Sequence, residues 1–195
     1  MSLTNSLETA ACAGSLTIHA IAARSHFVAP EGFPARMKLI AALFFLFGAA
    51  NVWTLSKATI DPPYAIASLL AYAGALWLFS AAWRANRGRP LTVAFTPDIP
   101  GHLVTSGPYR FIRHPFYTSY CLTWFAGAAG ARSALLFSMF AGMTLAYSRA
   151  ARFEEQKFLR SDLGPAYAAY CTNTGMFIPV FGKRGETRNR EMPQP

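Results

Sequence analysis

Long uncharged apolar stretches alternate with polar segments along most of the chain. Four regions have the length and composition of helices that cross a bilayer: residues 39–56, 63–83, 115–131 and 134–150. Arg132 and Ser133 interrupt the last apolar region, which favours two helices in a hairpin, because one long helix would place an arginine at mid-bilayer. The pattern therefore predicts an all-α integral membrane protein with about four transmembrane helices arranged as two hairpins.

The first 36 residues give a weaker pattern. Residues 10–23 are mildly apolar, include His19, and are too few to span a bilayer. Arg24 follows this stretch instead of preceding it, which disfavours a cleaved signal peptide. We expect residues 1–36 to be weakly structured or to form a surface helix, with Met37 as an alternative translation start. Residues 37–182 are then the membrane domain, and residues 183–195 a disordered basic tail.

Composition and charge support a membrane protein. Of the 195 residues, 53% are hydrophobic and 14% are charged, whereas soluble domains carry about 25% charged residues. The formal net charge is +9, and if the four helices alternate in direction, all 18 lysines and arginines except Lys57 and Arg132 lie on one side of the membrane. The positive-inside rule makes that side cytoplasmic, together with both termini. This placement explains the positive charge without nucleic acid as a partner. No nucleic-acid recognition motif accompanies the charge, which also disfavours nucleic-acid binding.

The loop of residues 101–117 holds the densest group of polar and turn-forming residues. Pro115 suits the first turn of a helix, which leaves Arg113 and His114 at the helix N-terminus. Free backbone N–H groups and the helix dipole attract anions there, and a guanidinium adds a bidentate donor. The alternative is that Arg113 reaches lipid headgroups and His114 only caps the helix.

A second polar group follows the last predicted span, where Glu154 and Glu155 are adjacent. Near an anionic membrane surface, this pair favours a ligand that is cationic or rich in hydroxyls. The alternative is helical pairing, such as that of Arg152 with Glu155. We expect no metal site, because the histidines and cysteines lack ligand spacing. These residues are His19, His26, His102, His114, Cys12, Cys121 and Cys171.

The two polar groups match one family. The segments GHLVTSGPYRFIRHPFYTSY (101–120) and FEEQKFLRSDLGPAYAAYCTNTGMFIP (153–179) resemble the isoprenylcysteine carboxyl methyltransferases and their bacterial relatives, which share a membrane core with the phospholipid N-methyltransferases. Ser119 stands where many members have glycine, and as another small residue it should preserve close helix packing.

The resemblance implies a methyltransferase that uses S-adenosylmethionine, in a multi-pass protein of a bacterial inner membrane. The cofactor would occupy a cytoplasmic pocket formed by the 101–117 loop and the C-terminal segment, while a lipophilic or lipidated substrate enters from the bilayer. The implied catalytic residues are Arg113, His114 and Glu154. The implied cofactor-binding residues are His102, Leu103, Val104, Gly107, Pro108, Tyr109, Arg113, His114, Tyr117, Glu154 and Glu155.

The methyl acceptor stays open at this point. The motifs are most like those of the protein C-terminal S-isoprenylcysteine carboxyl O-methyltransferases, and a carboxylate acceptor needs positioning and a counter-ion such as Arg113. A phospholipid amine or a thiol would instead need a base, His114 or a glutamate. A non-enzymatic lipid-binding module is the alternative of another class. Since no Gly-x-Gly loop follows a predicted strand, the usual soluble methyltransferase architecture is excluded. The oligomeric state is not predicted.

Overall fold

The computed structural model describes residues 3–28, 32–87, 91–92, 94–96 and 98–180, and five long helices dominate it. The basic tail predicted for residues 183–195 lies outside the described residues. The elements are α1 (Leu3–His26), β1 (Phe27–Val28), α2 (Ala35–Lys57), α3 (Pro62–Ala85), β2 (Leu91–Thr92), the 3-10 turn η1 (Gly107–Arg110), α4 (Pro115–Ala131), α5 (Ala134–Leu159) and α6 (Gly164–Asn173). The two-residue strands β1 and β2 pair in parallel. The predicted all-α class is confirmed.

Helices α2, α3 and α4 lie close to the predicted ranges, and α5 begins where the sequence pattern places it. Helices α2 and α3 are each long and apolar enough to cross a membrane. Helices α3 and α4 both open with proline, whose missing N–H is not needed in a first turn. The predicted hairpin break is confirmed, since Arg132 adopts a left-handed conformation and the Ser133 hydroxyl caps α5. Helix α5 continues past residue 150 and carries the glutamate pair.

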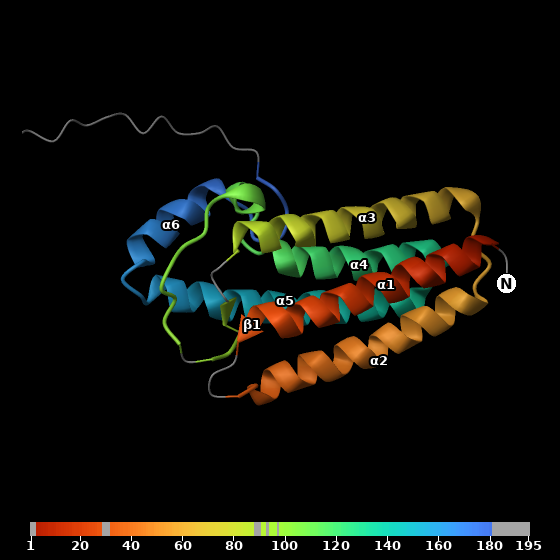
Figure 1. The fold of residues 1–195 in the computed structure, drawn as a ribbon, viewed down its shortest axis with the longest axis horizontal. Coiled ribbons are helices and arrows are strands. Elements are labelled where there is room, and N and C mark those ends of the chain that lie inside the picture. The colour runs from red at the N-terminus through yellow and green to blue at the C-terminus, as the bar shows by residue number, and fades with distance from the viewer. Residues whose placement is uncertain (1–2, 29–31, 88–90, 93, 97, 181–195) are drawn as a thin grey trace, which may run out of the picture.

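The N-terminal segment corrects the prediction of a weakly structured region or surface helix. Helix α1 packs against α2, α3 and α4 (Figure 1). Three of its polar side chains are buried and hydrogen-bond to other helices: Glu8 to Ser68 (2.8 Å), Ser15 to Thr123 (3.3 Å) and His19 to Ser119 (2.8 Å). These side chains weaken the apolar pattern of α1, yet they have partners inside the bundle. The residue that departs from the family pattern, Ser119, is the partner of His19.

The addition of α1 also changes where the described chain begins relative to where it ends. The Asn5 side chain donates to the carbonyl of Ala58, so α1 begins beside the turn between α2 and α3. The last described residue, Val180, donates its N–H to the carbonyl of Phe111 near the start of α4. The described chain therefore begins and ends at opposite ends of the bundle (Figure 1), and not at the same end as predicted.

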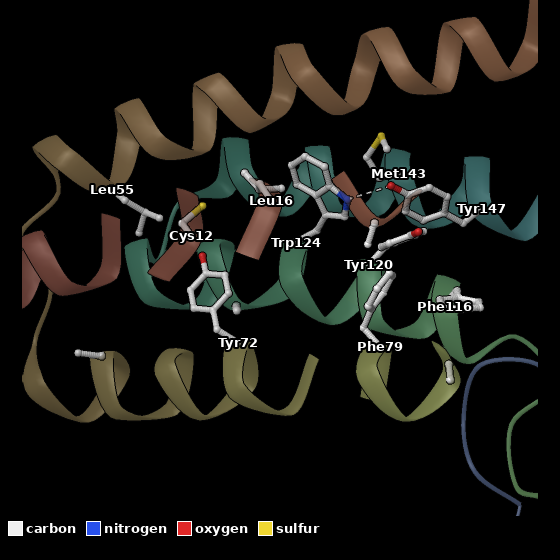
Figure 2. Close-up of a cluster of buried hydrophobic side chains, with 14 of the residues drawn as sticks. Cys12, Leu16, Leu55, Tyr72, Phe79, Phe116, Tyr120, Trp124, Met143 and Tyr147 are labelled. Atoms are coloured by element: carbon white, nitrogen blue, oxygen red, sulfur yellow. Dashed lines mark hydrogen bonds between the residues drawn. The ribbon is translucent and has the colours of Figure 1, made fainter. Parts of the chain in front are cut away.

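An aromatic core holds α3, α4 and α5 together (Figure 2). Trp124, 1% exposed, donates from its indole N–H to the hydroxyl of Tyr147 over 3.3 Å. Gly127 lets α4 approach its neighbours closely, because a Cβ there would lie 2.2 Å from Oδ1 of Asn51 and 3.0 Å from the Tyr72 hydroxyl. This packing fixes the ends of α3, α4 and α5 relative to one another, and the chemistry-bearing loop lies at those ends.

Candidate functional site

A cavity of about 300 Å³ lies where α3 ends and α4 begins, between the 98–104 segment, α5 and α6. Eight of the predicted site residues line it: His102, Leu103, Val104, Tyr109, Arg113, His114, Tyr117 and Glu154. Three predicted residues do not line it, namely Gly107, Pro108 and Glu155. The structure therefore brings the 101–117 loop and the helix that carries the glutamate pair to one cavity.

Gly107 and Pro108 shape the turn that presents Tyr109. Gly107 has a φ of +59°, and a Cβ added there would lie 3.3 Å from the Cβ of Ala85 at the end of α3. Glycine therefore suits both the backbone conformation and the close approach. The carbonyl of Tyr109 accepts a hydrogen bond of 2.6 Å from the hydroxyl of Tyr170 on α6. Gly107 and Pro108 thus support the cavity wall without lining it.

Arg113 joins α5 to the segment that follows α6. Its Nε donates to Oε1 of Glu155 over 2.8 Å, and its Nη1 donates to the carbonyls of Cys171 and Thr174. The backbone N–H of Arg113 donates to the carbonyl of Gly175 over 2.8 Å. Much of the donor capacity of Arg113 is therefore used within the protein, and Glu155 acts on the cavity through it.

His114 lies between the two carboxylates. Its Nε2 is 3.3 Å from Oε1 of Glu155, and its Nδ1 is 3.6 Å from Oε2 of Glu154. Burial opposes the imidazolium, but the hydrogen bonds and charges of the two glutamates outweigh that effect and raise the pKa of His114. Burial likewise opposes the Glu155 carboxylate, yet hydrogen bonds from His114 and Arg113 lower the pKa of Glu155 to about 2. The site is a network of charged pairs.

Glu154 faces the cavity with a different set of partners. Its Oε1 accepts a hydrogen bond of 2.7 Å from the hydroxyl of Tyr117 on α4. The ring of Tyr117 stacks on that of Tyr147, with centroids 5.5 Å apart. A carboxylate beside an aromatic face suits a cationic group.

Sequence reasoning missed several lining residues. Lys157 is one helical turn beyond Glu154, so helix spacing is a signal that would have found it. Its ammonium pairs with Oδ1 of Asp98 over 2.8 Å and so joins the 98–104 segment to α5. Asn86, Tyr167 and Tyr170 also line the cavity, and no local motif marks Asn86, which terminates α3.

The donors and acceptors fit a ligand such as S-adenosylmethionine. Two buried atoms of cavity-lining residues, Oδ1 of Asn86 and Nε2 of His102, have no hydrogen-bond partner among the described residues. Charged groups of both signs line the same cavity, including Arg113 and Glu154. A ligand with a carboxylate, an ammonium and neutral polar edges requires such a combination. The described residues contain no group of three or more His, Cys, Asp or Glu able to hold a metal ion.

Comparison with known protein families supports the resemblance seen in the two motifs. No curated protein matches the chain. The sequence model of the phospholipid methyltransferase family matches residues 62–166, from the start of α3 into α6. That region contains the loop, the cavity-lining part of α4 and the glutamate pair. With more than half of the chain matched and two helices able to cross a membrane, the chain belongs to the phospholipid methyltransferase family and is a membrane methyltransferase of the phospholipid or isoprenylcysteine kind.

Proposed function

We propose that this chain catalyses methyl transfer from S-adenosylmethionine to a lipophilic acceptor at the cavity described above. The observation that carries the proposal is the network of Arg113, His114 and Glu154 on the cavity wall, within the part of the chain that matches the family. When bound, the cofactor supplies an electrophilic methyl carbon, and the bond from the acceptor forms as the carbon–sulfur bond breaks, with its electron pair retained on sulfur. The protein must therefore bind the cofactor and the acceptor, orient them for the transfer and exclude water from the cavity.

The charged residues divide this work. Glu154 and the Tyr117 ring are suited to a cationic part of the cofactor, since the carboxylate and the ring face both favour positive charge. The remaining donor capacity of Arg113 is suited to a carboxylate, and His114, whose two ring nitrogens face Glu154 and Glu155, adds positive charge beside it. Glu155 is a positioning residue, because it contacts Arg113 and His114 but does not line the cavity.

The acceptor that fits these groups best is the C-terminal carboxylate of a prenylated cysteine. A carboxylate is already ionised at neutral pH, so its methylation requires no base. This agrees with the raised pKa of His114, which disfavours a neutral imidazole able to take a proton. A phospholipid amine is the second candidate, favoured by the matching family, and Glu154 is then the candidate base.

We further propose that the cavity end of the bundle faces the cytoplasm. Among the described residues, Lys57 and Arg132 lie at the opposite end, where Arg132 pairs with Asp61. The other described lysines and arginines lie on segments that begin or end near the cavity. The positive-inside rule assigns that end to the cytoplasm. The acceptor would then reach the cavity from the adjoining leaflet.

The experiment uses purified protein in vesicles and S-adenosylmethionine labelled in its methyl group. One preparation receives a farnesylated cysteine with a free carboxylate, and the other contains phosphatidylethanolamine. Alkali releases volatile methanol from a methyl ester, whereas an N-methyl group stays on the headgroup nitrogen in non-volatile form, so the two products are distinguished chemically. Base-labile label supports the prenylcysteine acceptor, and base-stable label in phospholipid supports the amine. Absence of cofactor binding by folded protein would reject the enzyme in favour of a lipid-binding module.

A further inference from the structure

The end of α3 places a neutral donor–acceptor pair on the cavity wall. Asn86 is 1% exposed and follows the last residue of α3. Its side-chain nitrogen donates to the carbonyl of Ala82 over 2.9 Å and to the hydroxyl of Tyr109 over 2.7 Å. A carbonyl only accepts, so the bond to Ala82 fixes which end of the amide is nitrogen. The oxygen Oδ1 is then the end that has no partner among the described residues.

Tyr109 completes the pair. Its hydroxyl oxygen accepts from Asn86, which leaves the hydroxyl proton available for donation. Burial raises the pKa of Tyr109, so the hydroxyl keeps that proton at neutral pH. Asn86 and Tyr109 both line the cavity, and the pair combines an unpaired acceptor with a neighbouring donor.

The chemistry of this pair differs from that of the charged network. Arg113, His114 and Glu154 match ionised groups, whereas an amide oxygen beside a phenol matches a neutral ligand edge with a donor next to an acceptor. Adenine has such an edge, because its exocyclic amine donates and the neighbouring ring nitrogen accepts. An unpaired buried carbonyl oxygen is costly, and a ligand that donates to it removes that cost.

We propose that Asn86 and Tyr109 recognise the adenine of the cofactor, with Oδ1 of Asn86 accepting from the exocyclic amine. The inference rests on the proposed function, since it requires an adenosyl cofactor in this cavity. Asn86 is thereby a specificity-determining residue outside the two motifs that carry the family resemblance.

The test is isothermal titration of detergent-solubilised protein with two ligands, S-adenosylhomocysteine and S-inosylhomocysteine. The second ligand replaces the exocyclic amine with a carbonyl oxygen, which would face Oδ1 of Asn86 without a proton. Wild-type protein should bind the adenosyl ligand about 10- to 100-fold more tightly, as expected when a buried acceptor loses its donor. In Asn86→Leu, affinity for the adenosyl ligand should fall and the preference should shrink to within about twofold.

Asn173→Leu is the matched control. Asn173 lies at the end of α6, is exposed, and donates to the carbonyl four residues earlier, as Asn86 does. Its substitution should leave both affinities and the preference unchanged. Asn86→Asp, which retains an acceptor oxygen, should keep the preference for the adenosyl ligand.

The outcomes separate the two proposals. Equal affinity of the wild type for both ligands would overturn the adenine assignment without any variant, and so would an unchanged preference in folded Asn86→Leu. In either case, binding of S-adenosylhomocysteine would leave the proposed function standing. If folded wild-type protein binds neither ligand, the proposed function itself fails.

Discussion

Replacing Glu155 by glutamine should weaken the folded structure more than the same change at Glu154. Glu155 holds Arg113 at 2.8 Å and His114 at 3.3 Å, and both glutamate and arginine side chains are largely buried. A hydrogen bond to a charged group contributes about 1.5–3 kcal/mol, against about 0.5–1.5 kcal/mol for a neutral one. Loss of the charge at two contacts therefore costs roughly 2 kcal/mol. For a chain of this size, that corresponds to a fall in Tm of roughly 4–8 °C.

The assay is thermal unfolding in detergent without ligand, followed by near-ultraviolet circular dichroism. Glu154→Gln is the matched control, because Glu154 accepts from the neutral hydroxyl of Tyr117 and lies further from His114, at 3.6 Å. The Glu154→Gln substitution should lower Tm by about half as much or less. It should also weaken the binding of S-adenosylhomocysteine. If the Tm of Glu155→Gln lies within about 1 °C of the wild-type Tm, the ion pairs of Glu155 do not stabilise the packing of the C-terminal segment.

Three further outcomes are expected. Gly127→Ala places a Cβ 2.2 Å from Oδ1 of Asn51 and should destabilise the bundle by about 1–3 kcal/mol. Gly142→Ala, with open space around it, should be neutral or slightly stabilising. Equal melting temperatures of the two variants in thermal unfolding would contradict the packing argument. The lowered pKa of Glu155 contributes stability that is complete above the ordinary pKa of 4.5 and is lost as pH falls toward about 2. The difference in unfolding free energy between wild type and Glu155→Gln should therefore shrink over that pH window in urea titrations. A difference that stays constant with pH would refute this linkage. Tyr117→Phe removes the hydroxyl that donates to Glu154 and should weaken S-adenosylhomocysteine binding by about 5-fold in isothermal titration, with unchanged affinity as the contrary result.

The sequence predicted the parts of the molecule that depend on local patterns. The uncharged stretches predicted helices α2 to α5, because a helix satisfies its own backbone hydrogen bonds inside a bilayer. Arg132 and Ser133 predicted the break between α4 and α5, since a charged residue and a capping residue are unfavourable at mid-bilayer and favourable at a helix end. The motifs likewise predicted the family, and eight of the site residues predicted from them line the cavity.

The tertiary structure decided the features that depend on distant partners. One face of helix α1 is buried in the bundle, where His19 meets Ser119, 100 residues away, and no pattern within α1 indicates that pairing. Arg113 pairs with Glu155, 42 residues away, and donates to the carbonyls of Cys171 and Thr174 at the end of α6. Most of its hydrogen-bonding capacity, which the sequence suggested was open to a ligand, is therefore used within the protein. Asn86 lines the cavity at the end of α3, where Gly107 allows the turn before Tyr109 to approach Ala85. The sequence by itself determined helices α2 to α5 and which residue types gather near the membrane surface. Only the packing of the helices decided the place of α1 and which side chains remain available to a ligand, because many charged groups and amides are paired with groups from distant segments.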